Sequence, residues 1–127
     1  MRGKTGDSGT GVSPVFSVLS PPNPHKGPEN MPVYLIIDIA IIDQDAYGEF
    51  VERVPAVVEQ YGGRYLVRGG EVSTMVGDWQ PERIVLIQFE SIEQVQEFFA
   101  SPEYLAIVPL REQSAATRAI IIEGYGP

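Results

Sequence analysis

Cysteine, histidine and lysine are the residues that this sequence lacks or nearly lacks. The chain has no cysteine, so a disulfide framework, a thiolate nucleophile and a cysteine-ligated metal are excluded. After residue 31 it also has no histidine and no lysine. A histidine-based triad, a histidine-ligated zinc or haem and a lysine Schiff base are therefore excluded from this part of the chain. We predict no metal and no cofactor, which leaves chemistry to carboxylate, tyrosine, arginine, hydroxyl and backbone groups.

Positive charge is also scarce. Nine lysines and arginines stand against 17 acidic residues, and the formal net charge is −8. This balance argues against a surface for nucleic acid, which needs clustered lysine or arginine, and against an anionic membrane surface. No apolar run is long enough for a membrane-spanning helix or for the core of a signal peptide. We expect a cytoplasmic protein that binds neither nucleic acid nor membrane.

The first 30 residues differ in composition from the rest of the chain. They are rich in glycine, proline and serine and poor in large apolar residues, which predicts a disordered leader. Three interpretations stay open: a genuine tail, a mis-assigned start with translation beginning at Met31, and a short proline-rich ligand for another domain. In each case residues 31–127 form one folded domain.

Apolar periodicity predicts strands and helices in residues 31–127. The run 33–42 has the length and the β-branched content of a buried strand. An apolar stripe at three- and four-residue spacing predicts a helix over 43–61. A second helical stretch begins at the capping residue Ser91 and changes direction at Ser101. The other strands are expected over 64–68, 83–90 and 118–123.

This order of elements is typical of the ferredoxin-like fold, an α+β architecture. It predicts a four-stranded antiparallel sheet with the helices on one face. The side chains expected to face the helices are Val33, Leu35, Ile37, Ile39, Val85, Ile87, Phe89, Ile120 and Ile122. The other face would carry Tyr34, Ile36, Asp38, Ile84, Leu86, Gln88, Ile121 and Glu123. This second face is too apolar for water, so we expect a homodimer in which two sheets pack face to face.

Several short motifs after residue 31 together carry a resemblance. They are Met31-Pro32-Val33-Tyr34, the run from Tyr61 to Gly70, the run from Gly77 to Arg83, and Ser101-Pro102-Glu103-Tyr104 with Arg111. The pattern resembles the family called domain of unknown function 1330, in the dimeric α+β barrel superfamily, over residues 31–127. The resemblance implies the dimeric ferredoxin-like fold and no established reaction. Other members of the superfamily are monooxygenases, isomerases, polyketide cyclases and haem enzymes, an analogy at the level of the fold.

Asp38 is the candidate catalytic residue because it interrupts an apolar strand. A carboxylate that faces a cavity between sheets would serve as a general base. The structural alternative is an ion pair between Asp38 and an arginine of a neighbouring strand.

The candidate ligand-binding residues are Arg68, Gly70, Trp79, Arg83, Gln88 and Arg111. Arginine can hold a carboxylate through two hydrogen bonds, a double glycine lets the backbone approach a ligand, and tryptophan can form a wall of a pocket. Each candidate has a structural alternative. Arg68 would pair with an acid at a bulged strand end, and Trp79 would seal the sheet or the dimer interface. Arg111 would pair with Glu103 or Glu112, and Gln88 would bond to Glu123.

Two classes of function follow. The first is a small enzyme that binds a compact anionic or carbonyl-containing molecule and acts as a cofactor-independent isomerase, cyclase or monooxygenase. The second is a non-catalytic, structural or stress-associated dimer.

Overall fold

The computed structural model describes residues 31–125 of the chain. The predictions for residues 1–30 lie outside the described residues. The elements in chain order are β1 (Val33–Ile41), α2 (Gln44–Gln60), β2 (Arg64–Arg68), β3 (Arg83–Phe89), α3 (Ile92–Ala100), α4 (Pro102–Ser114) and β4 (Ala115–Glu123). They confirm the predicted ferredoxin-like α+β fold, in which the second helical stretch is divided into α3 and α4. No helix in the described part of the chain is long and apolar enough to cross a membrane.

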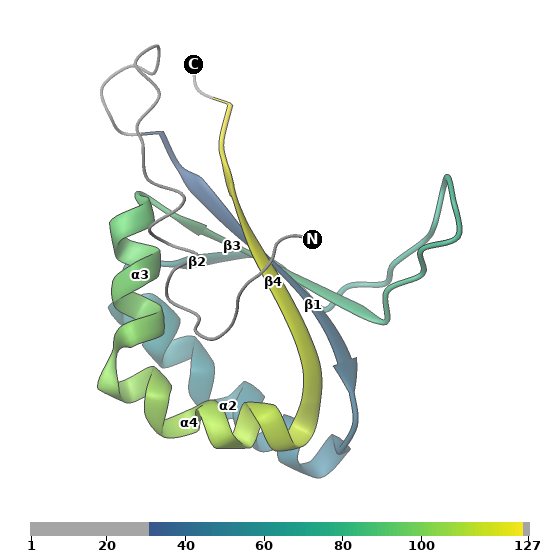
Figure 1. Cartoon of the computed structure of the whole chain (residues 1–127), viewed down its shortest axis with the longest axis horizontal. Helices are drawn as coiled ribbons and strands as arrows, with labels where there is room; N and C mark the ends of the chain where they lie inside the picture. The colour runs from purple at the N-terminus through teal and green to yellow at the C-terminus, as the bar shows by residue number, and fades with distance from the viewer. Residues whose placement is uncertain (1–30, 126–127) are drawn as a thin grey trace, which may run out of the picture.

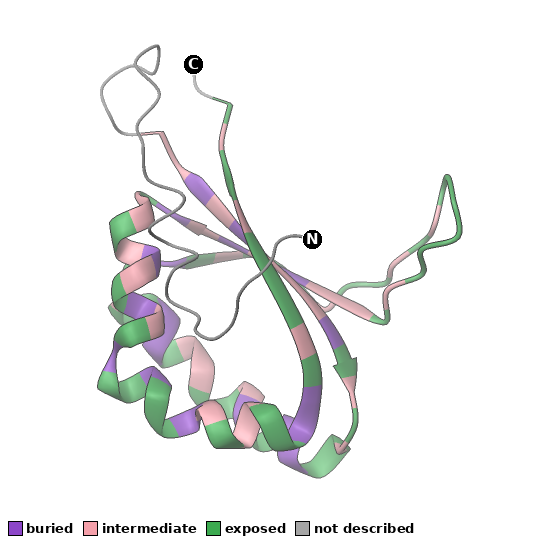
Figure 2. Cartoon of the chain, viewed as in Figure 1, coloured by how far each residue is buried: buried purple, intermediate pink, exposed green. Residues whose placement is uncertain are grey.

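The four strands form one sheet in the order β2-β3-β1-β4. Each neighbouring pair is antiparallel, and all three helices lie on the same side of the sheet (Figure 1). Buried residues gather where the helices meet the sheet (Figure 2). Leu35, Ile87 and Phe89 are among the largest side chains that are fully buried. The hydrophobic effect therefore accounts for one layer of helices on one face, and none of the helices within residues 31–125 covers the other face.

Polar side chains at helix starts determine where each helix begins. Asp43 caps α2, since its Oδ1 accepts hydrogen bonds from the backbone N–H groups of Asp45 and Ala46, both at 3.1 Å. Ser91 caps α3 in the predicted way, by accepting from Gln94 N at 3.2 Å. Ser101 is buried and separates α3 from α4.

The hydroxyl of Ser101 serves both helices that it joins. It donates to the carbonyl of Phe98 at 2.8 Å and accepts from the backbone N–H of Tyr104 at 3.0 Å. Pro102 occupies the first turn of α4, where its missing N–H costs no hydrogen bond. This junction sets the direction of α4 and brings Tyr104 against the aromatic rings of Phe98 and Phe99.

The predicted orientation of β4 is wrong. In the observed register Leu35 pairs with Ile121 and Ile37 with Ala119, so these residues share the helix-facing side. Ile120 and Ile122 lie on the outer face and are 58% and 46% exposed. Three consecutive isoleucines carry no alternation, so the sequence pattern did not determine which of them points inward. Because β4 begins at Ala115, small side chains rather than isoleucines line the first half of its inner face.

A bulge in β2 changes the direction of the side chains that follow it. Tyr65 pairs with Ile87, but Val67 pairs with Leu86, so Leu66 is the extra residue. Without the bulge, strict alternation would place Tyr65 and Arg68 on opposite faces. With it, both share the helix-facing side of β2.

Residues 69–82, which we call the arm, join β2 to β3 and project away from the body (Figure 1). Side-chain hydrogen bonds brace the arm internally. Thr74 Oγ1 donates to the carbonyl of Trp79 at 2.7 Å, and Gln80 Nε2 donates to the carbonyl of Val72 at 3.3 Å. Large apolar side chains stand out from it: Met75, Val76 and Trp79 are 87%, 91% and 60% exposed.

Candidate functional site

A cavity of about 80 Å³ lies between the helix-facing side of the sheet and the helices. One water needs about 10–15 Å³ of such space, so the cavity can hold a ligand of several non-hydrogen atoms. Its walls are mainly isoleucine, valine and phenylalanine. The polar side chains on its lining are Tyr47, Tyr65, Arg68, Arg83, Tyr104, Arg111 and Thr117. No aspartate, glutamate or histidine of residues 31–125 belongs to this lining, nor do three such side chains gather anywhere in that range to hold a metal ion.

The small side chains on β4 contribute one wall of the cavity. Thr117 and Ala119 line it from the inner face of this strand. Ala119 is exposed although it is part of the lining, so the cavity reaches solvent beside β4. The prediction placed Ile120 and Ile122 on this inner face, where their larger side chains would have filled part of this space.

Arg83, the first residue of β3, is held between a glycine and an aromatic ring. A β-carbon on Gly69 would overlap the guanidinium of Arg83, so this group lies directly on the Gly69 backbone. The Cζ atom is 5.3 Å from the centre of the Tyr47 ring, within the range of a cation–π interaction. The Nε atom of Arg83 is buried and has no hydrogen-bond partner among the described residues. A buried donor without a partner is costly, and an acceptor on a ligand would satisfy it.

Arg68 approaches the same cavity from the last position of β2. Its Nη2 donates to the carbonyl of Val51 in α2 at 3.0 Å, and its Cζ is 5.1 Å from the centre of the Tyr65 ring. Neither Arg68 nor Arg83 has a carboxylate within 4.0 Å in the part of the chain that the structure describes. Two positive charges from adjacent strands therefore line the same cavity, and neither has an acidic neighbour among the described residues.

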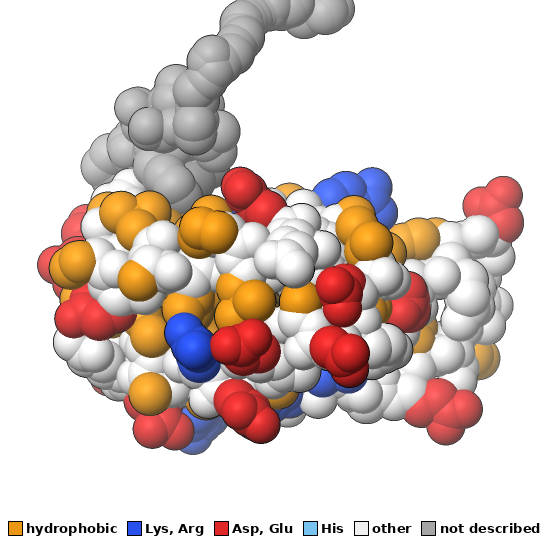
Figure 3. All heavy atoms as spheres, turned by 90° about the horizontal axis from the view of Figure 1, so that it is seen from below, with side chains coloured by type: hydrophobic (Ala, Val, Ile, Leu, Met, Phe, Trp, Pro, Cys, Tyr) orange, Lys and Arg blue, Asp and Glu red, His pale blue; other side chains and the backbone are white. Residues whose placement is uncertain are grey.

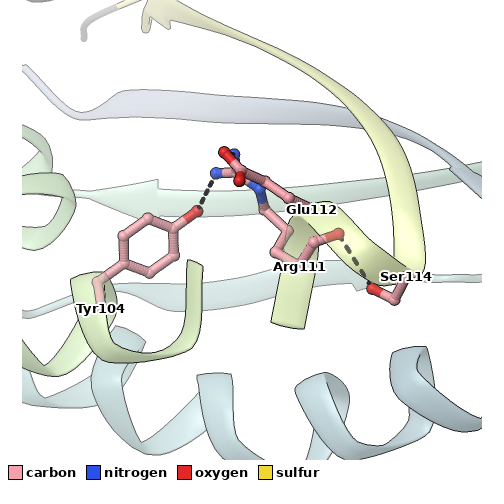
Figure 4. Close-up of polar contacts among 4 residues, drawn as sticks. All are labelled: Tyr104, Arg111, Glu112 and Ser114. Atoms are coloured by element: carbon pink, nitrogen blue, oxygen red, sulfur yellow. Dashed lines mark hydrogen bonds and ion pairs between the residues drawn. The ribbon is translucent and has the colours of Figure 1, made fainter. Parts of the chain in front are cut away.

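Arg111 forms a third positive group from the last turn of α4 (Figure 4). Its Nη1 donates to the hydroxyl oxygen of Tyr104 at 2.7 Å, and its Nη2 is 3.6 Å from Oε2 of Glu112. Of its two predicted acidic partners, Glu112 is therefore the one nearby. The Glu112 side chain is 67% exposed, so solvent screens its electrostatic interaction with Arg111.

Glu103, the other acid expected beside Arg111, instead joins two helices. It accepts hydrogen bonds from the Tyr61 hydroxyl at 2.8 Å and from Gln60 Nε2 at 3.2 Å, at the end of α2. The hydrogen bond from Tyr61 is the main reason that the pKa of Glu103 is lowered, and it raises the pKa of Tyr61. These contacts hold the start of α4 against the end of α2.

Two tyrosines on the lining keep their protons well above neutral pH. Burial raises the pKa of Tyr65 to about 12, although the nearby charge of Arg68 opposes the shift. Burial also raises the pKa of Tyr104, against the effect of Arg111. Both phenols are thus hydrogen-bond donors at neutral pH.

The charge of the lining is opposite to that of the chain as a whole. The chain carries a formal net charge of −8, and acidic side chains are spread over the surface seen from the helix side (Figure 3). Three of the six arginines after residue 31 nevertheless line one cavity. A site of this kind favours a ligand with a negatively charged group and an apolar body.

Three of the predicted ligand-binding residues line the cavity, and they are Arg68, Arg83 and Arg111. The three that do not are Gly70, Trp79 and Gln88. Trp79 is exposed on the arm, and Gln88 accepts a hydrogen bond from Arg64 at 3.4 Å on the outer face of the sheet.

Asp38 also lies on the outer face, away from the cavity. Its Oδ2 is 2.5 Å from Nη2 of Arg118, the residue that pairs with it on β4. This contact is the ion pair with a neighbouring strand that the sequence analysis gave as the alternative to a catalytic role. The Asp38 side chain is 19% exposed, and that of Arg118 is 77% exposed.

Two residues that shape this candidate site were missing from the sequence-based candidates. Tyr104 was named only as part of a family motif, and its hydroxyl oxygen accepts a hydrogen bond from Arg111. The double glycine was expected to let the backbone approach a ligand, whereas Gly69 provides the space for the guanidinium of Arg83. The available signal was a pair of adjacent glycines after one predicted strand and an arginine at the start of the next. Only the pairing of these two strands shows that Gly69 and Arg83 are in contact.

Comparisons with known proteins place this geometry in a wider group. The family described as "Domain of unknown function (DUF1330)" matches residues 32–125. Among curated proteins, none matches the chain at a significant level. A protein of unknown function from Rhodopseudomonas palustris has a similar structure, with a TM-score of 0.71 at 16% identity over 93% of this chain and 97% of that one.

Two further solved structures resemble the chain at lower similarity. One is SnoaB, a cofactor-independent oxygenase from Streptomyces nogalater, with a TM-score of 0.54 at 8% identity over 76% of this chain and 96% of that one. The other is a dabb family protein with a ferredoxin-like fold from Mesorhizobium loti, with a TM-score of 0.55 at 9% identity over 76% and 99% of the two chains. At these identities the likeness shows the fold alone.

Proposed function

We propose that this chain, which belongs to the family of domain of unknown function 1330, binds a small anionic or carbonyl-containing organic molecule in the cavity beneath its sheet. The observation that carries the proposal is the placement of Arg68, Arg83 and Arg111 on a mainly apolar lining that has no carboxylate among the described residues. Arg68 and Arg83 have no carboxylate partner among the described residues, and an anionic ligand would supply the missing acceptors.

Native mass spectrometry of the freshly purified full chain tests this proposal directly. We expect an additional small mass that leaves on denaturation, or, in an empty preparation, saturable binding of a short carboxylate such as pentanoate. Replacement of Arg83 by Gln should weaken that binding, whereas Arg53→Gln on the exposed side of α2 should not. A protein that carries no small molecule and binds no carboxylate would refute the proposal.

The same lining could support an enzyme, because arginine and tyrosine donors stabilise the oxygen of an enolate. Cofactor-independent isomerisation, cyclisation and oxygenation all pass through such a species, and the fold is shared with the cofactor-independent oxygenase SnoaB. Proton removal needs a base, however, and the described lining has no carboxylate or imidazole. Binding is therefore the function that we propose first, with turnover as its extension.

A homodimer is the second part of the proposal. The outer face of the sheet combines exposed Ile120 and Ile122 with partly exposed Ile36 and Leu86, and no helix of the described residues covers it. A twofold arrangement of two such faces would bury both at once, as the resemblance to dimeric α+β barrels implies. Trp79 on the arm would then contact the partner subunit. Such a contact agrees with the role at the dimer interface that was the alternative to ligand binding for this residue.

Trp79 provides the measurement for the dimer, since it is the only tryptophan in the chain. Dilution should shift its fluorescence to longer wavelength as dimers separate and the indole becomes hydrated. A sedimentation mass of one chain at all concentrations would contradict the dimer.

A further inference from the structure

The cavity lining contains two pairs of polar side chains that differ in charge, which we call the first end and the second end. The first end consists of Arg68 and Arg83, from adjacent strands, neither with a carboxylate within 4.0 Å among residues 31–125. The second end consists of Tyr104 and Arg111, both from α4. No hydrogen bond or ion pair in the described part of the chain connects the two ends.

The first end favours a ligand group that carries a full negative charge. Arg83 cannot turn away easily, because its guanidinium lies between the Gly69 backbone and the Tyr47 ring. Its buried Nε has no acceptor among the described residues. Arg68 uses one Nη2 donor on the carbonyl of Val51, a neutral group that leaves its charge uncompensated. A carboxylate that accepts from both arginines would satisfy this end.

The second end is suited to a neutral or partly charged oxygen. The charge of Arg111 already has Glu112 at 3.6 Å. The Tyr104 oxygen accepts from Arg111 at 2.7 Å, so its own proton is free to be donated. A hydroxyl polarised by a cation is a strong donor to a carbonyl or enol oxygen. A second carboxylate at this end, in contrast, would be repelled by the negative charge of Glu112.

From these two ends we infer that the ligand is a short oxo acid. Its carboxylate would lie at Arg68 and Arg83, and its carbonyl oxygen would accept from Tyr104 beside Arg111. The inference rests on the proposed function and adds the second functional group to it. The volume of about 80 Å³ and the apolar walls limit the remainder of the ligand to a few carbon atoms.

Isothermal titration of the full chain with matched five-carbon compounds tests the inference. The probes are 2-oxopentanoate and 4-oxopentanoate, with pentanoate, which lacks the oxo group, and glutarate, which has a second carboxylate. At least one oxo acid should bind about tenfold more tightly than pentanoate. The affinity for glutarate should not exceed that for this oxo acid. Equal affinities for pentanoate and both oxo acids, or a preference for glutarate, would overturn the inference while the proposed function stands. Failure of every carboxylate to bind would instead overturn the proposed function.

Two variants locate the second functional group. Tyr104→Phe keeps the ring against Phe98 and should remove the advantage of the oxo acid over pentanoate while the pentanoate affinity stays within about twofold. Tyr34→Phe, on the outer face, is the matched control and should change neither affinity. An unchanged oxo-acid preference in a folded Tyr104→Phe protein would overturn the assignment.

Glu112→Gln is a second, independent variant whose side chain is too exposed to be needed for folding. Removal of the acid beside Arg111 should raise the affinity for glutarate severalfold relative to the oxo acid. An unchanged ratio of the two affinities would show that Glu112 does not set the charge of this end and would overturn that part of the inference.

Discussion

The guanidinium of Arg83 occupies the space that a β-carbon on Gly69 would need. Gly69 has a φ of +84°, a conformation that residues with a β-carbon rarely adopt, and its N–H donates to the carbonyl of Ile84 at 3.2 Å. The glycine thus both turns the chain from β2 into the arm and provides the seat for Arg83. Because Arg68 and Arg83 flank the arm directly, the position of both arginines depends on how this segment leaves the sheet.

Gly69→Ala should lower the free energy of unfolding by about 1–3 kcal/mol, since the positive φ becomes strained and the new methyl group displaces Arg83. Urea unfolding measures the change, and ligand affinity should fall with it. Gly70→Ala is the adjacent control, because a β-carbon there meets no atom within 4 Å. Equal effects of the two substitutions would contradict the role given to Gly69.

Arg83→Gln should weaken carboxylate binding by about 10- to 100-fold, the usual value of one charge-assisted hydrogen bond. Arg53 is the control, because it pairs with Glu49 at 3.0 Å on the exposed side of α2. Isothermal titration of both variants compares the effects. A loss of the same size in Arg53→Gln would point to the overall charge rather than to the cavity.

Carboxylate affinity should be constant between about pH 6 and about pH 9. Burial raises the pKa of Tyr65 to about 12 and also raises that of Tyr104, so neither phenol loses its proton in this interval. The stability that comes from burying the neutral phenols is likewise fully present below about pH 10 and is lost as the pH rises through the raised values. Titration of affinity against pH, with ultraviolet absorbance to follow tyrosine ionisation, checks both expectations. A decline in affinity between pH 7 and pH 9 would be inconsistent with the raised pKa values.

Ile120→Asp should convert the proposed dimer into monomers, because it would place an unpaired carboxylate in the interface between the sheets. The monomer should still fold, since Ile120 is 58% exposed in a single chain. Leu105→Asp is a control of matched exposure, 55%, on α4 away from the outer face. Sedimentation equilibrium should find monomers only for the first variant. Dimers that persist in Ile120→Asp would move the interface elsewhere.

Asp38→Asn should leave ligand affinity unchanged and lower stability by about 0.2–1 kcal/mol, the range of a pair with one exposed partner. A double-mutant cycle with Arg118→Gln measures the coupling between the two side chains. A folded Asp38→Asn protein that binds ligand but has lost a demonstrable turnover would return Asp38 to the role of general base.

The positions of strands and helices were readable because local patterns and tertiary packing agree. Strand residues 64–68, the cap at Ser91 and the change of direction at Ser101 were all expected from length and side-chain chemistry. The sequence did not predict which side chains of β4 face the helices, since isoleucine at three consecutive positions fits either orientation. Pairing with β1 decided it, and the resulting Thr117 and Ala119 wall opened the cavity.

Some features of the candidate site could likewise be predicted from the sequence, and others could not. Arg68, Arg83 and Arg111 stood out because basic residues are rare in an acidic chain. Whether they met depended on a one-residue bulge at Leu66, on the room above Gly69 and on the turn at Ser101, none of which periodicity reports. Asp38 stood out equally, but the sheet placed it opposite Arg118 on the other face.

The sequence by itself determined which elements form, their order and the scarcity of positive charge, because these depend on local patterns and composition. Only the tertiary structure decided which face each side chain takes and which arginines share one cavity. Side-chain direction reverses with a shift of a single residue, and strand register, which sets that shift, is a property of paired strands rather than of any one segment.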